Sequence, residues 1–143
     1  MINNIAVWGQ AVTLSATVKG VAPGNPVPPD GENVTFTDTS TGNTLGTAML
    51  SHGVAVLSPA VTGLSVGPHV IQASYAGDAP GGSFLANVGT FTLTVNKDST
   101  TTRVTGPGGT PTYGTDLTFT VTVSPNSPGS GTPSSPLPRR SSA

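Results

Sequence analysis

Several short stretches of the chain alternate between apolar side chains and hydroxyl-bearing or other polar ones. A period of two places the apolar residues of a β-strand on one face and the polar residues on the other. No stretch of ten residues shows the spacing of an amphipathic helix. Gly, Pro, Asn and Asp residues separate the stretches, as is typical of antiparallel sandwiches and barrels. The alternating segments are residues 12–18, 34–37, 54–57, 70–75 and 91–95.

The alternation also predicts which residues form the core, because it assigns one face of each strand to the interior. The chain has no cysteine, so cohesion depends on buried apolar area, at about 25 cal/mol per Å². The predicted core consists of Val12, Leu14, Val18, Phe36, Val56, Ile71, Tyr75, Phe91, Leu93 and Val95.

An internal repeat relates the start of the chain to a segment near its end. Residues 8–18, WGQAVTLSATV, align with residues 113–123, YGTDLTFTVTV, at an offset of 105 residues. The inward apolar positions match apolar positions, the outward hydroxyls match hydroxyls, and a Pro/Gly-rich loop follows both segments. A period near 100 residues corresponds to one sandwich domain per repeat.

The repeat divides the chain into three predicted parts. Residues 1–98 form one nearly complete domain whose first strand would lie before Met1, and residues 99–123 begin a second, truncated repeat. Residues 124–143 form a Pro/Ser/Gly-rich tail that we expect to be disordered. Residues 99–105 are the predicted opening strand of the second repeat. Two strands alone cannot bury a face, so we expect the segment 117–123 to add to an exposed strand edge of the first domain or of a neighbour.

Composition and charge exclude several classes of function. The net charge is −1, and only 8% of the residues are charged, whereas nucleic acids and anionic membranes attract basic surfaces. No apolar run reaches the length of about 20 residues that spans a bilayer, and the first residues show no signal peptide. The absence of cysteine excludes thiol catalysis, disulfides and thiolate metal sites.

One short motif raises the possibility of an enzyme. Residues 63–67, GLSVG, match the G-x-S-x-G pattern of serine hydrolases. That motif works on a turn from a strand into a helix, whereas Pro68 and a predicted strand follow here. No histidine follows Asp78, although the hydrolase order requires one after the acid. We therefore assign Ser65 to a turn between strands and expect no catalytic residue and no cofactor.

The histidines and acidic residues are too scattered to predict a metal site. His52 lies in a turn, and His69 begins a strand on the same face as Ile71, so we expect His69 to be a hydrogen-bonded structural residue near the domain end. Calcium requires six or more oxygen ligands, whereas Asp in turns usually accepts hydrogen bonds from its own backbone. The only candidates for a calcium site, most plausible at the junction between repeats, are Asp78, Asp98, Asp30 and Glu32.

Three aromatic residues are expected to have structural roles. Trp8 and Tyr113 occupy equivalent positions in the repeat, which favours packing at the domain end. Tyr75 is a candidate for the hydrogen-bonded tyrosine corner that some antiparallel sandwiches contain.

Several motifs, in order along the chain, resemble those of bacterial immunoglobulin-like repeats of the group 3 type. They are WGQAVTL at 8–14, GENVTF at 31–36, LGTA at 45–48, GVAVL at 53–57, VGPHVIQASYAGD at 66–78 and FTLTV at 91–95. The resemblance covers residues 7–98 and restarts near residue 99. It departs from the family in the missing first strand and in an enlarged loop at 79–87. It implies an all-β, immunoglobulin-like antiparallel sandwich of about seven strands, and it transfers no catalytic residues.

The resemblance also implies a function and a location. Such repeats form extracellular stalk or adhesin modules in tandem arrays on bacterial surface proteins. We therefore expect a structural spacer in a longer extracellular or cell-surface chain, with neighbouring immunoglobulin-like repeats as partners and a supporting role in adhesion. The alternative is a module that binds a carbohydrate or a host or matrix protein through its end loops, above all residues 77–87. We expect neither nucleic-acid binding nor membrane insertion.

Overall fold

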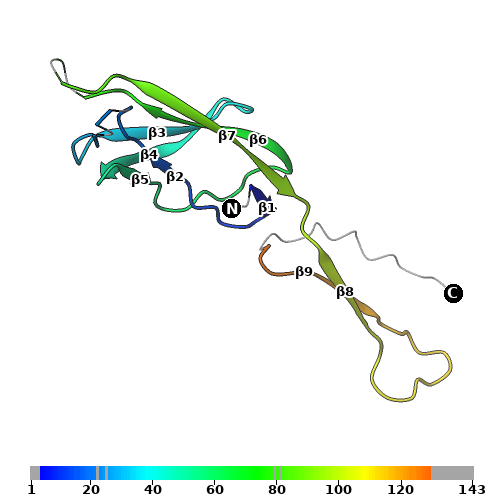
Figure 1. Ribbon diagram of the computed structural model, residues 1–143. Coiled ribbons are helices and arrows are strands. Elements are labelled where there is room, and N and C mark those ends of the chain that lie inside the picture. The colour runs from blue at the N-terminus through cyan, green and yellow to red at the C-terminus, as the bar shows by residue number, and fades with distance from the viewer. Residues whose placement is uncertain (1–3, 22, 25, 79, 81, 130–143) are drawn as a thin grey trace.

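The computed structural model describes residues 4–21, 23–24, 26–78, 80 and 82–129, and the chain is all-β over these residues (Figure 1). None of them forms a helix long and apolar enough to cross a membrane. The strands are β1 (Ile5–Val7), β2 (Ser15–Thr17), β3 (Asn33–Asp38), β4 (Asn43–Ser51), β5 (Val54–Val56), β6 (Gly67–Tyr75), β7 (Asn87–Asn96), β8 (Thr100–Thr105) and β9 (Thr120–Pro125).

The first seven strands form one curled sheet in the order β1-β7-β6-β3-β4-β5-β2. Strand β4 pairs with β3 up to Met49 and with β5 from Leu50 onwards, so it passes from one layer of the sandwich to the other. All neighbours run antiparallel except β1, which runs parallel to the end of β7. The predicted antiparallel sandwich is confirmed.

The core lies between the two layers and contains most of the residues that the alternation predicts. Six predicted residues are buried: Leu14, Phe36, Ile71, Tyr75, Leu93 and Val95. Val12, Val18 and Phe91 are partly buried and pack against them. The core also includes Ala6, Val34, Ala48, Leu50, Ala55 and Leu57.

The prediction for Val56 is wrong, because its side chain is 50% exposed while the neighbouring Ala55 is fully buried. All four residues of segment 54–57 are apolar, so the sequence pattern does not determine which face points inward. The pairing register of β5 determines the inward face, because Ala55 lies opposite buried Leu50 of β4 on one side and opposite Ala16 of β2 on the other.

Close packing of the two layers requires a glycine at position 46. The β3–β4 register shifts between Phe36 and Thr37, and Gly46 lies opposite Phe36. Its φ is 153°, and a Cβ atom there would lie 2.7 Å from Cδ1 of Leu57. A side chain at this position would therefore push β4 away from the segment that follows β5.

Strands β8 and β9 form a separate two-stranded antiparallel sheet that extends away from the first one (Figure 1). Strand β8 lies within residues 99–105, where the sequence predicts a strand. The expected addition of segment 117–123 to an edge of the first sheet is not observed, because β9 begins at Thr120 and pairs with β8 of the same chain. Strand β9 includes the first two residues of the predicted tail, and residues 130–143 lie outside the described residues.

The internal repeat has a structural counterpart in two equivalent turns. In the turns 7–10 and 112–115, the amide of the fourth residue donates to the carbonyl of the first, at 3.0 Å and 3.2 Å. The third residues, Gly9 and Gly114, have φ of 83° and 84°, the left-handed conformation that a type II turn requires there. The offset of 105 residues therefore relates equivalent backbone positions.

The aromatic residues only partly fulfil their predicted roles. Trp8 is 38% exposed, and its amide donates to the carbonyl of Asn96. Tyr113 is fully exposed, so the expected packing role is wrong for this residue. Tyr75 is buried, but its hydroxyl has no hydrogen-bond partner among the described residues. The predicted hydrogen-bonded tyrosine corner is therefore not formed.

Candidate functional site

The described part of the core contains two buried polar side chains, Asp38 and His69. Asp38 is the last residue of β3, and its side chain lies on the same inward face as those of Val34 and Phe36. His69 precedes Ile71 on the inward face of the neighbouring strand β6. Because β3 and β6 pair with Asp38 opposite Ile71, the carboxylate and the imidazole meet at one end of the sandwich.

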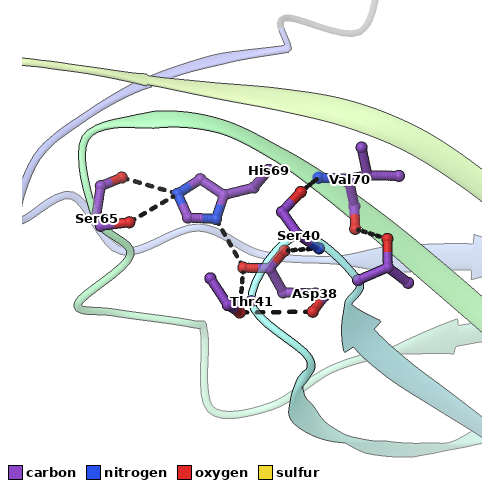
Figure 2. A network of polar contacts seen from close by, with 7 residues as sticks. Asp38, Ser40, Thr41, Ser65, His69 and Val70 are labelled. Carbon is purple, nitrogen blue, oxygen red and sulfur yellow. Dashed lines mark hydrogen bonds and ion pairs between the residues drawn. The ribbon is translucent and has the colours of Figure 1, made fainter.

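The two side chains form the centre of a hydrogen-bond network (Figure 2). The imidazole Nδ1 lies 2.7 Å from Oδ2 of Asp38. The same carboxylate accepts hydrogen bonds from the amide of Ser40 at 3.0 Å and from the hydroxyl of Thr41 at 2.9 Å. On the other side of the ring, Nε2 lies 2.8 Å from the carbonyl oxygen of Ser65. Every polar atom of the pair therefore has a partner.

These contacts favour the charged forms of both groups. The hydrogen bonds to the Ser65 carbonyl and to Asp38 raise the pKa of His69 above its ordinary value, although burial opposes this. Burial by itself would raise the pKa of Asp38, but hydrogen bonds from His69, Thr41 and Ser40 together lower it below the ordinary value. The carbonyl of Ser65 can only accept, and Nδ1 lies 2.7 Å from the Asp38 carboxylate, so the geometry places both ring nitrogens as donors, as in an imidazolium–carboxylate pair.

The network joins three segments that are distant in sequence. The β3–β4 turn is held because Asp38 accepts hydrogen bonds from Ser40 and Thr41. Its connection to β6 is made by the Ser40 hydroxyl, which accepts a hydrogen bond from the amide of Val70 at 2.8 Å. Through His69, the network also holds the loop before β6 at the carbonyl of Ser65. It fixes the end of the sandwich at which these segments meet.

Ser65, His69 and Asp38 superficially resemble a serine hydrolase triad, but the chemistry differs. A triad histidine must accept the proton of the serine hydroxyl at Nε2. Here Nε2 donates to the main-chain carbonyl of Ser65, and Oγ of Ser65 lies farther away, at 3.4 Å. Both ring nitrogens act as donors, so the imidazolium has no lone pair with which to activate the serine. The hydrolase motif requires a helix after the serine, whereas Ser65 is followed by strand β6.

The four candidate calcium ligands are not brought together. No group of three or more His, Cys, Asp or Glu residues within the described ranges is placed to hold a metal ion. Asp30 accepts a hydrogen bond from the amide of His52 in the β4–β5 turn, and Glu32 immediately precedes β3. One carboxylate oxygen of Asp98, near the domain junction, is buried without a described partner.

Asp78 closes the loop that the sequence suggested as a binding loop. Its carboxylate accepts hydrogen bonds from the amides of Ser83 and Phe84 at 2.8 and 2.9 Å. The bond from Phe84 is the main cause that lowers the pKa of Asp78. The carboxylate therefore fixes its own loop, of which residues 79 and 81 lie outside the description.

Sequence reasoning anticipated a hydrogen-bonded structural His69 but missed its partner. The signal for Asp38 was present, because it follows Val34 and Phe36 at the inward spacing of two. A carboxylate at such a position requires a buried partner. The identity of that partner depends on the pairing of β3 with β6, which the sequence pattern does not specify.

Comparison with known proteins places this sandwich in a family. Residues 2–96 match the family model of the bacterial Ig-like domain (group 3), and this segment ends at the last residue of β7. No match was found among curated proteins or among solved structures. The matched segment is more than half of the chain and contains the whole seven-stranded sheet, which confirms the predicted immunoglobulin-like sandwich. The chain belongs to the bacterial Ig-like domain (group 3) family.

Proposed function

We propose that this chain is a non-catalytic spacer module of a bacterial extracellular or cell-surface repeat protein, in which it supports adhesion by holding other domains at a distance. Family membership indicates a structural module of surface proteins, and domains of this family are generally non-catalytic and typically extracellular. The adhesive context and the neighbouring repeats as partners belong to the proposal.

The observation that carries the proposal is the parallel pairing of β1 with the end of β7. Ile5 lies opposite Thr94 and Val7 lies opposite Asn96. Tension that pulls the chain before Ile5 away from the chain after Asn96 therefore acts along both strands in opposite directions. It loads the hydrogen bonds of the pair together, in shear, instead of opening them one at a time.

The chain around this pair supports the same role. The pair is extended at both ends, because Thr94 donates to the carbonyl of Asn4 and Trp8 donates to the carbonyl of Asn96, at 2.8 and 2.9 Å. Only three residues, 97–99, separate β7 from β8. This short connection limits the reach of the link between successive modules.

Single-molecule force spectroscopy tests the proposal. The chain lacks cysteine, so a pair of introduced thiols fixes the two points of attachment. The variant Asn4→Cys/Lys97→Cys loads β1 against β7. The matched variant Ala11→Cys/Lys97→Cys leaves β1 outside the loaded path, and all three positions are exposed. We expect the first variant to unfold at the higher force at equal pulling speed. Equal unfolding forces would contradict the spacer mechanism.

A further inference from the structure

Residues 62–66, the segment before β6, are tied to the sandwich through a titratable side chain. The segment begins after Val61, which exchanges two main-chain hydrogen bonds of 2.8 Å with Val12. Within the described residues, the hydrogen bonds of the segment are made by Ser65, whose carbonyl oxygen and hydroxyl lie 2.8 and 3.4 Å from Nε2 of His69. The protonation state of this nitrogen therefore decides which group of Ser65 can bind it.

The two groups of Ser65 place opposite demands on the imidazole. A carbonyl oxygen can only accept a hydrogen bond, so it requires a proton on Nε2. A hydroxyl can also donate, so it can bind an Nε2 that has lost its proton. The carbonyl holds the nearer position in the structure. Because both groups belong to one residue, a local movement of the segment can exchange them.

Asp38 determines which of the two ring protons leaves first as the pH rises. Nδ1 lies 2.7 Å from Oδ2 of Asp38, and a hydrogen bond to a carboxylate is stronger than one to a neutral carbonyl. Asp38 of β3 supplies the charge that acts on the pKa of His69, whereas the residue opposite His69 on β7 is the apolar Leu93. The proton on Nε2 is therefore the one that is lost, and it passes to solvent beside the exposed Ser65.

Loss of this proton leaves an unfavourable contact. Nε2 and the Ser65 carbonyl are then two acceptors that face each other at 2.8 Å. The side chain of His69 is 3% exposed, and a buried polar atom without a hydrogen bond costs free energy. The contact is relieved when the segment moves until the Ser65 hydroxyl donates to Nε2. The bond between Nδ1 and Asp38 persists, so the strands themselves need not move.

The exchange takes place at the end of the sandwich from which the chain continues to β8 (Figure 1). Gly67, which directly follows the segment, lies opposite Val95 in the β6–β7 pair. Strand β7 ends one residue later, at Asn96, and residues 97–99 link it to β8. A movement of residues 62–66 therefore changes the surface beside this link.

We propose that His69 is a proton-operated latch for residues 62–66. In the protonated state, Nε2 donates to the Ser65 carbonyl and holds the segment in the observed position. When the Nε2 proton passes to solvent, the carbonyl is released and the Ser65 hydroxyl donates to Nε2 in its place. The surface beside the link then follows the pH of the surroundings. The inference goes beyond the spacer role, which depends on β1 and β7 and does not require titration of His69.

Nuclear magnetic resonance of the full chain tests the order of events. In a titration from about pH 5 to about pH 9, the nitrogen shifts of the imidazole should show that Nε2 loses its proton while Nδ1 keeps it. The amide shifts of residues 62–66 should change with the same midpoint as the His69 ring. Loss of the proton from Nδ1, or amide shifts of residues 62–66 that do not follow the His69 titration, would overturn the proposal.

The variant Ser65→Ala tests the exchange of the two groups, because it keeps the carbonyl and removes the hydroxyl. The protonated state should be unchanged, whereas the neutral state loses its replacement donor. The midpoint of the His69 titration should therefore rise by about 0.5–1 pH unit, which corresponds to one hydrogen bond of about 1 kcal/mol. Above the midpoint, amide order parameters of residues 62–66 should fall from about 0.85 to below about 0.6 in this variant but not in the native chain.

The matched control is Thr62→Ala, which removes an exposed hydroxyl of the same segment that does not contact His69. Its titration midpoint and its order parameters should equal those of the native chain. A midpoint in Ser65→Ala that is equal to or lower than that of Thr62→Ala would show that the Ser65 hydroxyl does not bind the neutral imidazole, and would overturn the proposal.

Discussion

The substitution Asp38→Asn tests whether the buried ion pair stabilises the sandwich. It keeps the shape of the side chain but removes its charge. The carboxylate accepts hydrogen bonds from His69, Ser40 and Thr41. Asparagine retains one acceptor oxygen, which can keep the bond from the Ser40 amide or from the Thr41 hydroxyl. The imidazolium of His69, which is 3% exposed, loses its counter-charge.

The expected loss follows from the burial of the pair. Breaking a buried ion pair by removing one partner costs about 3–5 kcal/mol. Because part of the hydrogen bonding at position 38 survives, we expect the lower end, about 3 kcal/mol. Domains of this size have unfolding free energies of about 5–15 kcal/mol, so the variant should remain folded but be clearly weakened.

Urea denaturation at pH 6, followed by circular dichroism, measures this effect. With a slope of about 1–3 kcal/mol per M, a loss of 3 kcal/mol lowers the midpoint by about 1–3 M. The matched control is Asp116→Asn, which makes the same chemical change at an exposed position outside the seven-stranded sheet. If Asp38→Asn shifts the midpoint no more than Asp116→Asn does, the ion pair does not stabilise the fold.

Three further predictions follow from the described contacts. Because the pKa of His69 is raised in the folded state, this residue contributes stability below about pH 6.5, and the contribution is lost as the pH rises through the folded pKa. Because the pKa of Asp38 is lowered in the folded state, this residue contributes stability above about pH 4, and the contribution is lost as the pH falls through the folded pKa. Thermal melts should therefore show a maximum between these values, and His69→Gln should remove the decline on the alkaline side. Ala55→Asp should prevent folding, whereas Val56→Asp should cost less than about 1 kcal/mol in urea denaturation, and equal losses would contradict the observed phase of β5. Tyr75→Phe should raise the unfolding free energy by about 1 kcal/mol, because it removes a buried hydroxyl that has no described partner; a loss of about 1 kcal/mol or more would instead reveal a hydrogen bond.

The sequence predicts a strand and its inward face where polar and apolar residues truly alternate. Residues 91–95 have threonine between the apolar positions, and the inward face of β7 is as expected. Residues 54–57 lack a polar residue, so the choice between Ala55 and Val56 required the pairing partners of β5. Strand β4 gave no alternating signal because its outward residue Met49 is apolar, although it is 68% exposed between buried Ala48 and Leu50.

The candidate site was predictable only in part, for the same physical reason. Local spacing indicates that His69 and Asp38 point inward, but the two residues are 31 positions apart. Their contact arises from the pairing of β3 with β6, a long-range feature of the topology. The hydrogen bond between His69 and the carbonyl of Ser65 depends on the path of the loop before β6, which no side-chain pattern encodes.

The central claim is that the module resists extension through the parallel β1–β7 pair. The most direct measurement is the unfolding force between attachment points at positions 4 and 97, compared with the force between positions 11 and 97. The account predicts a higher force for the first pair, because only that path loads the register from Ile5–Thr94 to Val7–Asn96 in shear. Unfolding at the same force along both paths would show that β1 contributes nothing to mechanical resistance, and would contradict the account.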